Sequence, residues 1–250
     1  MTVARKHVLA DLRERISALE GGIARRAGSL PFGVAEIDAT LPGGGLARGA
    51  LHEFAGGGAG TVDGAAAALF AAGIAARTTG QVAWCLTRPD LFMPALAQSG
   101  LHPGRVVFVE GDKEEDVLAS MEECLAYGGL GAVVGELVRL PMTASRRLQL
   151  AAERKGTIAL AVRRWRRQIE ANDFGQPTAA TTRWRISVLP SVDLPVQGVG
   201  RPRWLLELMR SRAGECAEFE IGACDDKGRI DILPRSGDRS DSESRSLYSA

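Results

Sequence analysis

SLPFGVAEIDATLPGGGLARGALHEFAG, residues 29–56, ends in an apolar strand, ALHEF, that runs directly into a glycine-rich loop. The loop continues to Gly60 and is followed by an alanine-rich helix, which we expect from about Asp63 to Arg77. A strand, a glycine-rich loop and a helix in this order form a phosphate-binding loop when the loop reads GxxxxGK[ST]. Backbone N–H groups then hold the phosphates, and the lysine neutralises the terminal ones.

The chemical groups of such a loop are missing here. With Gly56 aligned to the first glycine, Thr61 stands at the second. Val62 then takes the place of the lysine, and Asp63 that of the magnesium-binding hydroxyl. Asp63 brings a negative charge near any polyphosphate, and like charges a few ångströms apart cost about 1 kcal/mol even in water. We expect a degenerate loop without ATP catalysis, with weak nucleotide or anion binding as the alternative; its residues are Gly56, Gly57, Gly58, Gly60 and Thr61.

Short apolar runs alternate with helical patterns from residue 50 to about Arg167. The runs QVAWCL, RVVFVE, LGAVVGEL and TIALAVRR are continuously apolar, which is typical of parallel strands buried on both faces. Three extended runs follow without helices between them, RWRISVLP, RWLLELMRS and ECAEFEIG, and predict antiparallel strands that extend the sheet. The predicted fold class is α/β, with a mostly parallel central sheet, antiparallel C-terminal strands and helices on both faces.

Two terminal segments stand apart from the domain predicted over residues 28–233. Residues 1–27 contain a predicted helix with an apolar stripe at 3-4-3 spacing, which either packs on its own domain or docks on a partner; the stripe is Leu9, Leu12, Ile16 and Leu19. Residues 234–250 are serine-rich and charged, and we expect them to be disordered.

Composition excludes several classes of protein. The chain has 250 residues, 45% of them apolar, and a net charge of +1, so no global field draws it to DNA or membranes. Its four cysteines show no CxxC spacing, which leaves zinc and redox motifs unsupported. No apolar run approaches the roughly 20 residues of a membrane span. We expect a cytoplasmic protein with no bound metal or cofactor.

Charged residues at two strand ends are further candidate site residues. Glu136 ends the apolar strand AVVGEL, where a nucleotide site has its magnesium-side acid. The run RRWRR combines arginines, which bind phosphates, with a tryptophan on which bases stack, so it is a candidate contact for single-stranded DNA or an acidic partner. Its members are Arg163, Arg164, Trp165, Arg166 and Arg167. In RWRISV, alternation instead predicts an inward Trp184, with Arg183 and Arg185 outside.

The stretch 29–56 resembles the segment that leads into the phosphate-binding loop of RecA-type proteins. The matching positions are Gly33, Ile37, Asp38, Leu41, Gly43 to Leu46, Gly49, Glu53 and Gly56. Within that superfamily, the segments PGGGLARGALHEFAG, MEECLAYGGLGAVVGEL, ASRRLQLAAERKG and ATTRWRISVLPS are similar to the ImuA family of bacterial damage-induced mutagenesis. The resemblance covers roughly residues 5–222.

The resemblance implies an accessory factor in error-prone translesion DNA synthesis. Its implied partners are an ImuB-like Y-family polymerase homologue and an error-prone DnaE-type polymerase, with RecA and a weak single-stranded DNA contact as further candidates. Departures from a recombinase fit a role without catalysis. Thr87 and Arg88 stand where the water-activating glutamate is expected, and Arg163-Arg164 replaces the polar pair that senses the γ-phosphate. The alternatives are a DNA-dependent ATPase and a SulA-like inhibitor of cell division.

Overall fold

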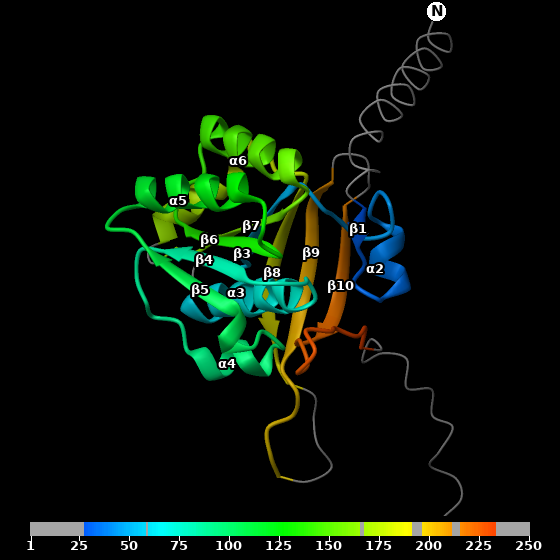
Figure 1. Cartoon of the computed structure of the whole chain (residues 1–250). Helices are drawn as coiled ribbons and strands as arrows, with labels where there is room; N and C mark the ends of the chain where they lie inside the picture. The colour runs from blue at the N-terminus through cyan, green and yellow to red at the C-terminus, as the bar shows by residue number, and fades with distance from the viewer. Residues whose placement is uncertain (1–27, 59, 166–167, 192–196, 212–215, 234–250) are drawn as a thin grey trace, which may run out of the picture.

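An eight-stranded sheet organises the chain in the computed structural model, which describes residues 28–233 except 59, 166–167, 192–196 and 212–215 (Figure 1). The predicted N-terminal helix with its leucine stripe and the predicted tail lie outside the described residues, as do Arg166 and Arg167. Among the residues that are described, no helix is long and apolar enough to cross a membrane.

The sheet has the strand order β10-β9-β8-β3-β7-β6-β4-β5. Its strands are β3 (Leu51–Gly56), β4 (Val82–Leu86), β5 (Val106–Glu110), β6 (Ala132–Leu137), β7 (Ile158–Arg163), β8 (Thr182–Leu189), β9 (Arg203–Ser211) and β10 (Ala217–Gly222). All neighbouring pairs from β8 to β5 are parallel, whereas β8–β9 and β9–β10 are antiparallel. The predicted fold class is therefore confirmed.

One strand differs from the expectation in its direction. We expected β8 to begin the antiparallel part of the sheet, but it runs parallel to β3. The reason is the long connection over residues 164–181. It returns the chain to the edge of the sheet at which β7 begins, as a crossover between parallel strands requires. Part of this connection is the 3₁₀ segment η2 (Gln168–Gly175), where the sequence predicts only a polar loop.

Helices cover both faces of the parallel part (Figure 1). One face carries α3 (Thr61–Ala76) and α4 (Met93–Gln98), and the other carries α5 (Glu114–Tyr127) and α6 (Met142–Lys155). Helix α3 is buried along most of its length, which explains its run of alanines: small side chains let it lie close to the sheet. The short 3₁₀ turn η1 (Pro103–Arg105) precedes β5.

The stretch that leads to β3 folds into a compact lead-in element. It contains a two-stranded ladder, β1 (Ser29–Leu30) with β2 (Leu46–Ala47), and the short helix α2 (Ala35–Ala39). Asp38 accepts hydrogen bonds from the backbone N–H groups of Phe32 and Gly33 at 2.7 and 2.9 Å. A Cβ atom on Gly45 would lie 2.6 Å from the carbonyl carbon of Leu30, so the turn between the two strands requires glycine there.

Candidate functional site

The candidate site lies at the carboxyl ends of adjacent parallel strands, where open α/β sheets bind ligands. The glycine loop follows β3, Glu136 lies at the end of β6, and β7 runs between these two strands. The last residue of β7 is Arg163, and Arg164 follows directly. The sheet order thus brings the predicted nucleotide-site elements and the arginine run to one edge.

Two backbone donors of the glycine loop, the N–H groups of Gly57 and Gly58, are occupied within the protein. Gly57 donates its N–H to the carbonyl of Ile186 on β8 at 2.7 Å. Gly58 donates its N–H to Oδ2 of Asp63 at 2.7 Å, and Val188 donates its N–H to Oδ1 of the same carboxylate at 2.9 Å. The sequence predicts that Asp63 repels phosphates. In the structure its carboxylate also takes a backbone donor that an anion would need, and it ties α3 to the end of β8.

Space beside the loop is limited as well. A Cβ atom on Gly57 would lie 1.7 Å from Oγ of Ser187, so the end of β8 packs directly on the loop. A hollow of about 120 Å³ remains, whereas pockets for drug-sized ligands hold about 300–1,000 Å³. Val62, at the position of the lysine, is 63% exposed. Among the described residues, the hollow is smaller than a drug-sized pocket, and Val62 brings no charge to the position of the lysine.

Glu136 is held by two side chains on the α3 face of the sheet. Its Oε1 accepts a hydrogen bond from Nε1 of Trp84 at 3.0 Å, and its Oε2 pairs with a guanidinium nitrogen of Arg164 at 2.6 Å. The same nitrogen of Arg164 lies 2.7 Å from Oδ1 of Asp90. Burial raises the pKa of Glu136, although Arg164 and Trp84 favour its ionised form. Burial lowers the pKa of Arg164, but the two carboxylates outweigh it and the net shift is upward.

Arg163 points to the opposite face, because consecutive residues of a strand alternate. It is fully buried, and one guanidinium nitrogen lies 2.6 Å from Oε1 of Glu53, also fully buried, on β3. A second nitrogen donates to the carbonyl of Val138 at 2.6 Å and pairs with Asp173 of η2. Arg163 therefore joins β3, the segment after β6 and η2 in one polar network.

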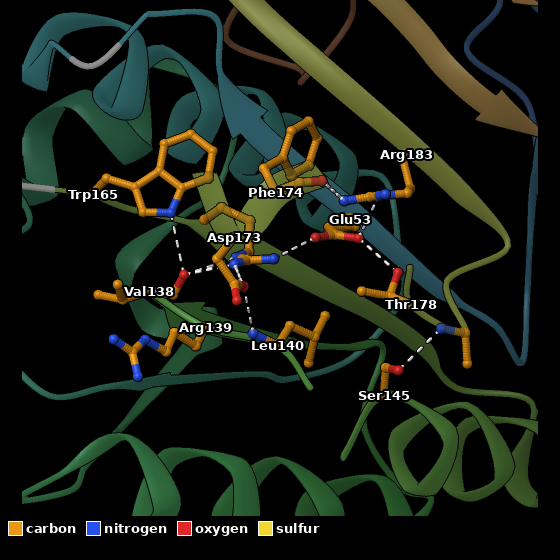
Figure 2. A network of polar contacts seen from close by, with 12 residues as sticks. Glu53, Val138, Arg139, Leu140, Ser145, Trp165, Asp173, Phe174, Thr178 and Arg183 are labelled. Carbon is orange, nitrogen blue, oxygen red and sulfur yellow. Dashed lines mark hydrogen bonds and ion pairs between the residues drawn. The ribbon is translucent and has the colours of Figure 1, made fainter. Parts of the chain in front are cut away.

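The other oxygen of Glu53 extends this network to β8 and to the connection before it (Figure 2). Oε2 accepts a hydrogen bond from the Thr178 hydroxyl and lies 2.8 Å from Nε of Arg183. The Arg183 guanidinium also lies 4.5 Å from the ring centroid of Phe174 and donates to the Phe174 carbonyl. We name Glu53, Arg163, Asp173, Thr178 and Arg183 the Glu53 network.

The connection over residues 168–181 is therefore fastened to the sheet. Trp165 donates Nε1–H to the carbonyl of Val138 at 3.2 Å, and its ring meets that of Phe174 edge to face at 5.7 Å. Leu140 donates its N–H to the Asp173 carboxylate at 3.3 Å. Three residues of this connection, Phe174, Thr178 and Ala180, are buried against the sheet.

Comparisons with known proteins agree with this architecture. The chain is 37% identical over 206 residues to Protein ImuA of Caulobacter vibrioides, both in strain NA1000 / CB15N and in strain ATCC 19089 / CIP 103742 / CB 15; the match covers 78% of this chain and 84% of each relative. This chain belongs to the ImuA family. No protein-family model matches it. The crystal structure of the RadB recombinase superimposes with a TM-score of 0.56 over 82% of this chain and 100% of that one, at 16% identity, which shows a RecA-like fold.

The structure of this ImuA-family chain corrects part of the predicted contact cluster. The prediction that Arg163 contacts DNA or a partner is wrong, because its side chain is fully buried. Trp165 is buried too, so it offers no free face for a base. Arg164 is 28% exposed but paired with two carboxylates. Arg183 was expected outside the sheet and is instead buried beside Glu53.

Glu53 matches the family pattern in the sequence, which assigns it no role. One signal was available: an acid inside the otherwise apolar run ALHEF, in a strand buried on both faces, requires a basic or hydrogen-bonding partner. Arg163 and Arg183 also stand in apolar strands. Nothing in the local pattern pointed to Asp173 or Thr178.

Proposed function

We propose that this ImuA-family chain is a non-catalytic accessory factor in error-prone translesion DNA synthesis. It acts through protein contacts with an ImuB-like Y-family polymerase homologue and an error-prone DnaE-type polymerase. Family membership and the RecA-like fold support a role in DNA-damage mutagenesis. The absence of catalysis and the identity of the partners are the parts that experiment must test.

One observation carries the non-catalytic part of the proposal: both nucleotide-site elements use their polar groups internally. Asp63 binds the N–H of Gly58 in the glycine loop, and Arg164 binds the carboxylate of Glu136. Metal-assisted phosphoryl transfer needs an acid that is free to hold magnesium and a cation at the terminal phosphates. Val62 supplies no such cation.

ATP turnover by the purified chain tests this part. We expect background hydrolysis with or without single-stranded DNA, and with or without the polymerase homologue. The matched control is Glu136→Ala, which removes the one acid placed for magnesium. A DNA-stimulated turnover that disappears in Glu136→Ala would refute the proposal and favour a DNA-dependent ATPase.

Binding to the purified polymerase homologue tests the partner. A chain without an ATP-driven switch should bind constitutively, so we expect complex formation with no nucleotide present. Biolayer interferometry with both purified proteins in nucleotide-free buffer measures their affinity directly. If the chain binds a cell-division protein and no polymerase component, the SulA-like hypothesis becomes the better one.

A further inference from the structure

Two neighbouring helices on one face of the sheet carry opposite charges (Figure 1). Helix α5, EEDVLASMEECLAY, contains five acids and no basic residue, whereas α6, MTASRRLQLAAERK, contains four basic residues and one acid. The Arg147 guanidinium of α6 pairs with the Glu122 carboxylate of α5 at 2.5 Å. Further along, a Cβ atom on Gly128 would lie 2.6 Å from Cδ of Lys155. The two contacts follow in the same order along both helices, so α5 and α6 lie side by side and run in the same direction.

Each helix has an exposed stripe at four-residue spacing, which places side chains on one side of a helix. The stripe on α5 is Glu115, Ala119, Glu123 and Tyr127, and the stripe on α6 is Arg146, Leu150 and Arg154. All seven residues are exposed, and the two large apolar ones, Tyr127 and Leu150, are 76% and 53% exposed. The two acids are eight residues apart and so are the two arginines, which is about 12 Å along a helix axis. We name these seven residues the α5–α6 face.

The four charged side chains of this face have no ion-pair partner among the residues that the structure describes. Other charged side chains of the same helices are paired, as Arg147 is with Glu122, and Glu153 accepts a hydrogen bond from Gln149 at 2.8 Å. A solvated helix surface is typically stabilised by charges of both signs at four-residue spacing. Each stripe of the α5–α6 face carries charges of one sign only.

Helix stability explains two of these four charges. The helix dipole favours acids in the first turn and basic residues in the last turn, which are the places of Glu115 and Arg154. Glu123 lies toward the C-terminal end of α5 and Arg146 toward the N-terminal end of α6, where the dipole does not stabilise their charges. The separation of the two signs is therefore a property of the combined surface.

A surface that is acidic on one side and basic on the other is complementary to itself. A two-fold axis that runs along the helices, between them, places α5 of each copy over α6 of the other. Acids then lie opposite arginines in both halves of the contact, and their equal spacing gives the two pairs matching separations. A nucleic acid is a poor occupant, because the acids of α5 repel its phosphates.

We propose that the α5–α6 face binds a second copy of this chain in a two-fold symmetric dimer. Glu115 and Glu123 of each copy pair with the arginines of the other copy, Arg146 and Arg154. Leu150 packs between these pairs against the apolar residues of the α5 stripe. The inference goes beyond the proposed function and does not depend on it, because self-association is measured on the chain alone.

Sedimentation velocity and light scattering of the purified full chain test this dimer. We expect a particle of twice 26.5 kDa, and its dissociation constant should rise with salt concentration because exposed ion pairs are screened. An acidic variant combines Arg146→Glu with Arg154→Glu, and a basic variant combines Glu115→Arg with Glu123→Arg. Each variant places like charges opposite one another and should raise the dissociation constant about tenfold or more.

Mixing the two variants gives the sharpest test. The mixture restores acid–base contacts in both halves of the interface, so it should form a heterodimer although neither variant dimerises alone. The matched control combines Arg88→Glu with Lys227→Glu, which reverses two exposed charges outside α5 and α6. This control changes the net charge as much as the acidic variant does, and it should leave the dissociation constant unchanged.

Several results would overturn the proposal. A monomeric wild type, or a mixture of the variants that stays monomeric, would exclude the assigned dimer. A control that dissociates like the acidic variant would show that net charge governs association. Variants with a lower unfolding midpoint and an unchanged mass would show that these charges act between α5 and α6 of one chain. If wild type is a monomer and the acidic variant loses affinity for the polymerase homologue, the face binds that partner and not a second copy.

Discussion

Replacing Arg163 with methionine should strongly destabilise the domain, and it should leave the exposed surface unchanged. The side chain is fully buried and contacts Glu53, Asp173 and the carbonyl of Val138. Removing one partner of a buried ion pair leaves an uncompensated charge and typically costs about 3–5 kcal/mol. Arg183 remains beside Glu53 and offsets part of the loss, so we expect about 3 kcal/mol.

The neighbouring arginine provides the matched control. Arg164→Met removes the same group one residue later, but that side chain is partly solvent-exposed, which weakens its ion pairs through screening. We expect a loss of about 1 kcal/mol in the free energy of unfolding. Urea unfolding followed by circular dichroism and tryptophan fluorescence measures both variants. For a slope of about 2–3 kcal/mol/M, Arg163→Met should lower the midpoint by about 1 M or more.

A double-mutant cycle with Glu53→Gln isolates the pair itself. The double variant should cost less than the sum of the two single variants, with a coupling of about 1–3 kcal/mol. Equal midpoints for Arg163→Met and Arg164→Met, or strict additivity in the cycle, would refute the argument that the Glu53 network stabilises the fold. An Arg163→Met variant with wild-type stability and weakened DNA binding would restore the original contact hypothesis.

Three further predictions concern single residues near the same strands. Val62→Lys should show no ATP turnover, because Arg164 still occupies Glu136; measurable hydrolysis would contradict the internal pairing seen here. Asp63→Ala should lower the unfolding free energy by about 1–2 kcal/mol, since two backbone donors lose a charged acceptor, and Asp63→Asn should cost less; equal losses would argue against these bonds. His52 is fully buried, and burial lowers its pKa from 6.5 to about 4, so only the unfolded chain takes up the proton between these values. Stability should fall by up to about 3 kcal/mol as the pH drops from 6.5 to 4, and His52→Gln should flatten this part of the pH profile; an unchanged profile would exclude His52 as its cause.

The sequence predicts the architecture well because the decisive signals are local. Continuous apolar runs identify the parallel strands, although one of them, RVVFVE, forms the edge strand β5 and is only partly buried. Glycine positions identify the turn and the loop around the first central strand. The identity of the ion pairs depends on strand order instead. Glu53 meets Arg183 because β3 and β8 are neighbours in parallel register, and the sequence alone predicts neither the pairing nor its direction.

The site residues also differ in how well the sequence predicts them, because some depend on local sequence and others on strand order. The prediction of a degenerate loop follows from three adjacent positions, Thr61, Val62 and Asp63, which alignment alone locates. Whether an arginine at a strand end faces solvent or an acid depends on what the neighbouring strands and the following connection present to it. The run RRWRR looks like a basic surface, yet its first arginine and its tryptophan are buried.

Two consecutive arginines at the end of β7 link the proposed loss of nucleotide chemistry to the attachment of the connection that follows. Adjacent residues of a strand face opposite sides, so Arg163 reaches Glu53 of one neighbouring strand and Arg164 reaches Glu136 of the other. The first arginine also binds Asp173 and thereby anchors η2 to the sheet. The second neutralises the acid placed for magnesium. Nucleotide-dependent chemistry at this site would require changes at Arg164 and in the glycine loop together. Substitution of one loop residue leaves the pair between Arg164 and Glu136 in place, so it does not free that acid for magnesium.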